Sequence, residues 1–275
     1  MKFKSIFIIF SITLLVFLII LVFMPYYMLG SALSGSFWKI YWPLILILAM
    51  VFLSFCGFYF TNRRLFLLLE KEDWPALVRY LEDRVIQKGR YSPRLVRLLA
   101  NSYFVLSDSQ SVMNLENKVA IAKPSLVDAN ALVFGTARIL GKDISGAARF
   151  FETRKETAKF PLKDWVHWYY GFSMLLNRQF EEAGKEFSVL SRISKDGVVT
   201  ALSSYFLSET IATALPDKWA EFRDIALEGK EKVLKTFPQL KNWNREVSRL
   251  SSEIHAAALA KYMEETRIWV YGKTK

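Results

Sequence analysis

Two long uncharged apolar runs near the start of the chain constrain its fold more than any other feature. The first covers residues 5–24 and the second covers residues 40–60. About 20 apolar residues in a helix cross a hydrocarbon core of about 30 Å. A cleaved signal peptide is the alternative for the first run, but its apolar region is usually only about 7–15 residues long. We therefore predict a membrane anchor of two transmembrane helices in residues 1–60.

The charged residues around these runs predict their orientation. Only three of the 37 basic residues lie in the first 60 positions, and no acidic residue precedes Glu70. The spans are flanked by Lys2 and Lys4 on one side and by Arg63, Arg64, Lys71 and Arg79 on the other, with only Lys39 in the connection. Basic residues favour the cytoplasmic side. We expect both termini to be cytoplasmic and the membrane to be a bacterial inner membrane.

Residues 61–275 are expected to be a cytoplasmic domain without catalytic chemistry. A single cysteine, Cys56, excludes a disulfide framework, and two histidines, His167 and His255, offer little for a metal site. The common nucleotide-binding, metalloprotease and serine-hydrolase motifs are absent from the sequence. We therefore expect no catalytic residue, no metal and no cofactor, and predict that the protein is not an enzyme.

The pattern of apolar residues in this domain predicts an all-α fold. Apolar residues recur at spacings of three and four, and strand-like alternation is absent. Proline and glycine interrupt the pattern at intervals that leave room for two helices each: 89–93, 123–124, 160–161, 196–197, 216 and 237–238. Segments of that size indicate a repeat of helix pairs.

Two adjacent segments share the same residues at a spacing of 36. The matching pairs are Gly135 with Gly171, Ala147 with Ala183, and Phe151 with Phe187. A small residue on the first helix allows close approach of the second, and the aromatic ring fills the space beside the crossing. We expect these six residues to define the repeat.

The pattern resembles the tetratricopeptide repeat (TPR). The stretch from Trp168 to Gly171, followed by Phe180, Ala183 and Phe187, carries the best match, and weaker copies extend the resemblance over residues 65–238. The resemblance implies an α-solenoid whose first helices line a groove for peptide segments or partner helices. Residues 239–270 carry an apolar stripe and are expected to form one capping helix, with a coiled-coil or dimer helix as the alternative.

We expect the groove to combine a basic and an apolar-aromatic part. Its predicted residues lie at matching positions of successive first helices: Arg94, Arg97 and Asn101, then Leu132 and Thr136, then Trp165, Trp168 and Phe172. An alternative interpretation places the tryptophan and phenylalanine row in the core between repeats, since stripes at helical spacing are usually core.

These features favour a membrane-anchored scaffold or adaptor that binds partner proteins at the cytoplasmic face. The alternatives are a lipid- or acyl-chain-handling protein that uses the aromatic groove, and a regulatory subunit of a membrane enzyme complex. The net charge of +11 and the acid-free basic stretch within residues 84–107 fit anionic lipid headgroups or an acidic protein partner. We expect no specific nucleic-acid binding, and homo-oligomerisation stays open.

Overall fold

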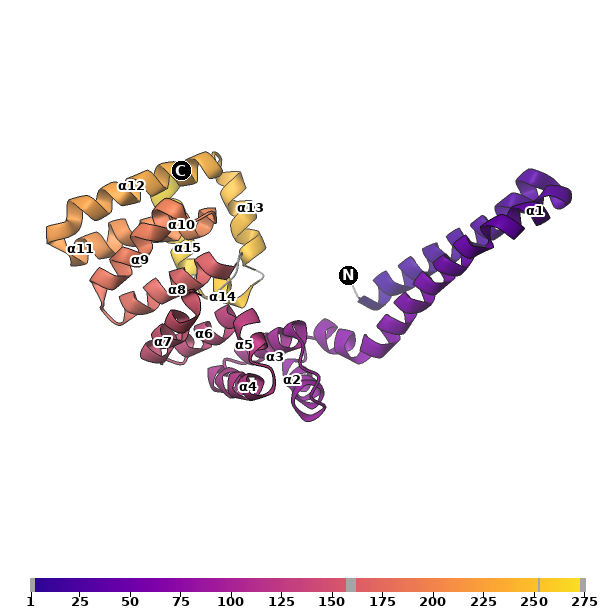
Figure 1. The fold of residues 1–275 in the computed structure, drawn as a ribbon, viewed down its shortest axis with the longest axis horizontal. Coiled ribbons are helices and arrows are strands. Elements are labelled where there is room, and N and C mark those ends of the chain that lie inside the picture. The colour runs from indigo at the N-terminus through magenta and orange to yellow at the C-terminus, as the bar shows by residue number, and fades with distance from the viewer. Residues whose placement is uncertain (1–2, 157–161, 252, 273–275) are drawn as a thin grey trace. The chain divides into compact units, whose positions relative to one another are not determined.

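The computed structural model describes residues 3–156, 162–251 and 253–272, and within these ranges it contains helices and turns but no strand (Figure 1). The predicted all-α class is confirmed for this part of the chain. Two compact units are present, Met1–Tyr80 and Leu81–Lys275. The predicted anchor ends at residue 60, whereas the second apolar helix continues without a break to Glu70.

The first unit is a helical hairpin. Helix α1 spans Phe3–Glu70 and reverses at Gly30, which has φ 70° and ψ 175°. Glycine adopts this positive φ without a Cβ clash. Ser5–Met28 and Tyr41–Glu70 are each long and apolar enough to cross a membrane. Phe7 stacks on Tyr59 with ring centroids 3.6 Å apart, so the two legs pack side by side.

The second unit is a succession of packed helices (Figure 1). After α2 (Trp74–Glu82) and a π-helical turn (Asp83–Gln87), the order is α3 (Pro93–Val105), α4 (Ser109–Ala122), α5 (Ser125–Ala129), α6 (Ala131–Leu140), α7 (Ile144–Lys155), α8 (Leu162–Leu176), α9 (Phe180–Ile193), α10 (Gly197–Phe206), a π-helical turn (Leu207–Ile211), α11 (Ala212–Ala214), a 3-10 turn (Pro216–Lys218) and α12 (Trp219–Thr236). Neighbours pack in sequence: α6 on α7, α7 on α8, α8 on α9 and α10 on α12. First helices also contact each other, α3 with α6 and α6 with α8.

A turn of constant geometry recurs between paired helices. Within the described ranges, positive φ at a non-glycine residue occurs at Glu72, Ser107, Lys142 and Arg178. The next residue in the first three turns is an aspartate that caps the following helix: Asp73, Asp108 and Asp143 each accept a hydrogen bond from a backbone N–H three positions on. The spacing of 35 or 36 residues therefore extends beyond the two segments that sequence comparison aligned.

The predicted close contact between glycine and phenylalanine is present in both aligned pairs. A Cβ on Gly135 of α6 would overlap the ring of Phe151 of α7. A Cβ on Gly171 of α8 would lie 3.0 Å from Cε1 of Phe187 on α9, a tight contact without overlap. Ala147 and Ala183 are fully buried beside these contacts. The same residue pattern therefore produces two crossings of different tightness.

Replacing Gly135 by alanine is expected to destabilise the helical domain by about 1–3 kcal/mol, because the added methyl group forces the Phe151 ring aside. Gly171→Ala is the matched control. There the gain in helix propensity, about 1 kcal/mol, offsets the milder crowding. Urea unfolding followed by circular dichroism measures both. Equal effects of the two substitutions would contradict the difference in tightness.

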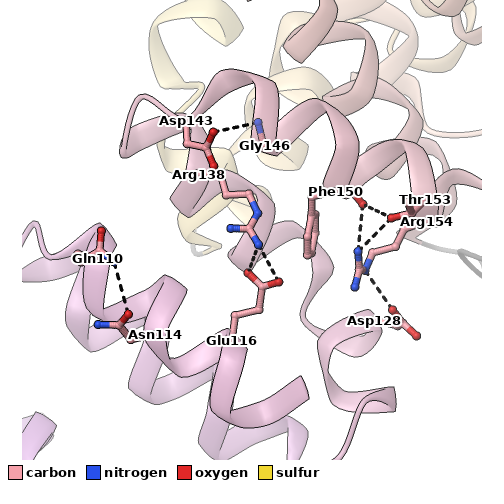
Figure 2. A network of polar contacts seen from close by, with 10 residues as sticks. All are labelled: Gln110, Asn114, Glu116, Asp128, Arg138, Asp143, Gly146, Phe150, Thr153 and Arg154. Atoms are coloured by element: carbon pink, nitrogen blue, oxygen red, sulfur yellow. Dashed lines mark hydrogen bonds and ion pairs between the residues drawn. The ribbon is translucent and has the colours of Figure 1, made fainter. Parts of the chain in front are cut away.

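A buried carboxylate, Glu116, lies 35 residues before Phe151, at the matching position of an earlier helix pair (Figure 2). Glu116 of α4 is mostly buried, and its carboxylate pairs with the guanidinium of Arg138 at 2.8 Å. Arg138 also lies over the ring of Phe150, 5.0 Å from the centroid. Burial raises the pKa of Glu116, while Arg138 opposes that shift. The ion pair thus fills a place that an aromatic ring fills in the later repeats.

The prediction of one helix over residues 239–270 is wrong. The chain forms α13 (Leu240–Leu250), α14 (Ile254–Ala257) and α15 (Ala260–Tyr271). In a continuous helix, the carbonyl of His255 would accept the N–H of Leu259. Here that N–H bonds to the Ala256 carbonyl instead, and the His255 carbonyl accepts the hydroxyl of Tyr169 at 2.8 Å. A long-range contact has replaced a helical hydrogen bond.

Candidate functional site

The apolar part of the predicted groove is buried. Trp168 is 0% exposed, and the other apolar-row positions are almost as inaccessible: Leu132, Thr136, Trp165 and Phe172. Trp168 packs against Phe172, with ring centroids 5.0 Å apart, and against Phe206, at 5.9 Å. The alternative that assigned the tryptophan and phenylalanine row to the core is the one that this structure supports. An open aromatic groove at these residues was a wrong prediction.

Residues 253–271, here called the C-terminal segment, cover this row. The ring of His255 packs on Trp165, with ring centroids 5.1 Å apart, and Tyr262 packs on Phe172 at 5.7 Å. In Figure 1 the yellow helices α14 and α15 return to the middle of the domain, and contacts place α14 on α6 and α15 on α10. The first helices of successive pairs are α3, α6, α8 and α10, and the surface that they line is here called the first-helix face. Part of this face therefore already binds a segment of its own chain.

Polar contacts fasten the far part of the C-terminal segment. The hydroxyl of Tyr205 donates to Glu265 at 3.1 Å, and Nζ of Lys230 donates to the Trp269 carbonyl at 2.8 Å. The hydroxyl of Tyr271 donates to the carbonyl of Phe237 at 2.7 Å. These contacts anchor α15 to α10, to α12 and to the residue that follows α12.

A polar cavity remains where the C-terminal segment meets α3 and α6. Its volume is about 220 Å³. It is lined by Arg97, Asn101, Ala129, Asn130, Leu132, Val133, Leu162, Glu253, Ile254 and His255. Two of the predicted groove residues, Arg97 and Asn101, thus meet Glu253 and His255, which lie more than 150 positions further along the chain. The sequence carries no local signal for that meeting.

Arg97 forms only long hydrogen bonds to neutral groups. Its Nε donates to Oδ1 of Asn130 at 3.5 Å, and its Nη2 donates to the carbonyl of Ala129 at 3.3 Å. No carboxylate of the described residues forms an ion pair with it. Arg94 lies one turn earlier on α3 and is exposed. The predicted basic part of the groove is therefore accessible, unlike the aromatic part.

On the opposite wall, Glu253 and His255 form a hydrogen-bonded pair. Nε2 of His255 lies 3.1 Å from Oε2 of Glu253. This hydrogen bond lowers the pKa of Glu253, and burial only partly opposes the shift. His255 is 3% exposed, and its Nδ1 has no hydrogen-bond partner among the described residues. Oδ1 of Asn101 is also buried and unpartnered in the described structure.

An apolar cavity of about 310 Å³ lies further along the C-terminal segment. It is lined by Thr136, Ile139, Leu140, Ile144, Tyr169, Phe172, Leu176, Ala258, Leu259 and Tyr262. Charged side chains are absent from this lining. The cavity therefore offers mainly apolar contact.

A partly buried charge cluster ties three helices together. Nζ of Lys155 donates to Oε1 of Glu186 at 3.0 Å, and Nδ1 of His167 lies 3.2 Å from Oε2. Burial alone would raise the pKa of Glu186, but the hydrogen bonds from His167 and Lys155 hold it below its usual value. These residues join α7, α8 and α9. In the described part of the chain, no group of three or more His, Cys, Asp or Glu side chains is placed to bind a metal.

Comparison with known proteins relates this chain to proteins of Treponema. A family model described as "Uncharacterised Treponema protein" matches residues 111–272, which is more than half of the chain. A protein of Treponema pallidum (strain Nichols), described as an uncharacterized protein, is 27% identical over 255 residues. That similarity covers 90% of this chain and 81% of the relative. The chain therefore belongs to this family of Treponema proteins.

Proposed function

We propose that this protein is a membrane-anchored scaffold of the TPR type, which binds a partner protein with an acidic segment at the cytoplasmic face of a bacterial inner membrane. One observation carries the proposal. The first-helix face holds the C-terminal segment along α6, α8 and α10, but on α3 it leaves Arg94 and Arg97 exposed. A face that already binds one segment of its own chain is suited to bind another from a partner.

The recurrent turn and the apolar hairpin support the two halves of this proposal. Turns with positive φ at intervals of 35 or 36 residues fit repeated helix pairs, which usually stack into solenoids. The two apolar legs would hold this domain at a bilayer, and the basic residues after the second leg favour a cytoplasmic domain. Tethering raises the effective concentration for partners in the same membrane.

The charge on α3 determines the expected partner chemistry. Arg94 and Arg97 are three residues apart and therefore share one face of the helix. Neither forms an ion pair with the described residues. Arginine binds carboxylates through two parallel N–H groups. An acidic peptide segment would supply the missing carboxylates.

Reversing one of these charges tests the scaffold. We expect Arg94→Glu to weaken partner binding by about tenfold, or about 1.4 kcal/mol, at low salt, with a smaller effect at high salt. Full-length protein in neutral-lipid nanodiscs would capture partners from detergent-solubilised membranes of the source organism. Quantitative mass spectrometry of the principal captured protein, over a range of bait concentrations, measures the change.

Arg149→Glu is the matched control, because Arg149 is an exposed arginine on the second helix α7 with no ion pair among the described residues. Equal losses for the two variants, or unchanged capture by Arg94→Glu, would refute the α3 docking surface. A parallel measurement uses vesicles of anionic lipid. Loss of vesicle binding without loss of capture would assign Arg94 to the membrane surface instead.

The apolar cavity favours acyl-chain binding as a second candidate function. Its lining of isoleucine, leucine and aromatic side chains has the chemistry that a short hydrocarbon chain requires. Leu140 and Leu176 are partly exposed at its edge. A fluorescent fatty acid that binds the wild-type protein and is displaced by unlabelled fatty acid would support this function, provided that Leu176→Asp no longer binds the probe. A probe whose fluorescence does not change on addition of either protein would eliminate it.

A further inference from the structure

The polar cavity between α3, α6 and the C-terminal segment has the size of a small metabolite. Its volume of about 220 Å³ corresponds to roughly seven water molecules at about 30 Å³ each. Its walls come from parts of the chain far apart in sequence: Arg97 and Asn101, then Asn130, then Glu253 and His255. A ligand there would contact the repeat helices and the C-terminal segment at once.

One wall of the cavity is cationic. The guanidinium of Arg97 has five N–H donors, and the described structure occupies only two of them, at 3.3 and 3.5 Å, with neutral oxygens. Hydrogen bonds to charged acceptors are shorter and stronger than such contacts. Arg97 therefore retains the capacity to bind a carboxylate.

The other wall is anionic. Glu253 is anionic near neutral pH, since the hydrogen bond to His255 lowers its pKa. That bond involves Oε2, so Oε1 is left to accept from another donor. Nδ1 of His255 and Oδ1 of Asn101 also have no partner among the described residues, but these atoms have almost no accessible surface, so a ligand in the cavity does not reach them.

Opposite charges in this cavity do not satisfy each other. Arg97 is close enough to influence the pKa of Glu253, yet no ion pair forms between them within 4.0 Å. A ligand that carries both a carboxylate and an ammonium group would bridge the gap. An anion would leave Glu253 unmatched, and a cation would leave Arg97 unmatched.

We propose that this cavity binds a free amino acid or a closely similar small zwitterion, with its carboxylate on Arg97 and its ammonium group on Glu253. Binding joins α3 to the C-terminal segment and therefore stabilises the packing of that segment on the domain. This inference goes beyond scaffold function and does not depend on a protein partner.

Thermal unfolding of the full-length protein in detergent tests the site. The probes are the common L-amino acids at millimolar concentration, together with the N-acetyl and methyl-ester forms of each amino acid that raises Tm. A ligand that binds only the folded state raises Tm. We expect at least one free amino acid to do so, and each blocked form to bind about tenfold more weakly, which is about 1.4 kcal/mol. Fluorescence of Trp165, which packs on His255, provides a second readout.

Charge-neutral variants assign the contacts. Arg97→Gln and Glu253→Gln should each weaken binding by about tenfold, while Arg149→Gln and Glu221→Gln, at exposed residues outside the cavity lining, should not. Circular dichroism confirms that each variant is folded. The proposal is overturned if no free amino acid binds, if acetate or an N-acetyl form binds as well as the free amino acid, or if Arg97→Gln has no effect. The Arg94→Glu capture assay is independent, so scaffold function and ligand site can fail separately.

Discussion

Trp168→Ala is expected to destabilise the helical domain by about 3–5 kcal/mol, the range for removing a large aromatic side chain from a core. Trp168 is fully buried on α8, where it contacts the rings of Tyr169, Phe172, Phe187 and Phe206. Its loss leaves a cavity between α8, α9 and α10. Chemical unfolding of the full-length protein in detergent, followed by circular dichroism, measures the change.

Trp219→Ala is the matched control. Trp219 begins α12, is 44% exposed and lies 4.7 Å from the guanidinium of Arg223, so we expect a change below about 1 kcal/mol. Similar losses for both tryptophans would show that Trp168 is not the centre of the core. A normal stability of Trp168→Ala with loss of partner capture would restore the open groove that the sequence predicted.

Ending the chain after Leu250 is expected to abolish cooperative unfolding of the helical domain. The deletion removes the buried side chains of Leu259, Met263 and Val270. It also exposes the faces of Trp165 and Phe172 on which His255 and Tyr262 pack. Burial of a large apolar side chain contributes about 1.5–3 kcal/mol, and whole domains are stable by only about 5–15 kcal/mol. Differential scanning calorimetry and dye binding to exposed apolar surface measure the outcome.

Ending the chain after Gly272 is the control, since it preserves all of α15 and should leave Tm unchanged. A truncated protein that ends at Leu250 and still unfolds cooperatively at the original Tm would show that the C-terminal segment is a peripheral addition. In such a truncated protein, Trp165 and Phe172 would be accessible to a partner, and the capture assay would detect the added binding.

The sequence predicted how paired helices cross, because that geometry depends on residues that are close together in the chain. Gly135 and Phe151 are 16 residues apart, within one helix pair, and their contact follows from the small and large residues at the crossing. The recurrent turn was also visible in principle, since Asp73, Asp108 and Asp143 are each 35 residues apart and cap the next helix. Sequence comparison aligned only the two segments where glycine and phenylalanine repeat together.

The sequence alone identified only some of the residues of the candidate ligand site. Arg97 and Asn101 were identified from their positions on a first helix, whereas Glu253 and His255 belong to a stretch expected to continue one long helix. An apolar stripe shows that a helix buries one face but does not identify the surface that covers it. Nothing in local sequence therefore indicated that the chain would return to α6.

The sequence by itself determined the apolar hairpin, the all-α class and the pairing of adjacent helices, because helix length, apolar periodicity and turn residues act over a few tens of residues at most. Tertiary structure alone decided where the last helix breaks and what fills the first-helix face. The hydroxyl of Tyr169 takes the carbonyl of His255 out of its helical hydrogen bond, an exchange between residues 86 positions apart. That contact depends on the folded position of both partners, which no local pattern encodes.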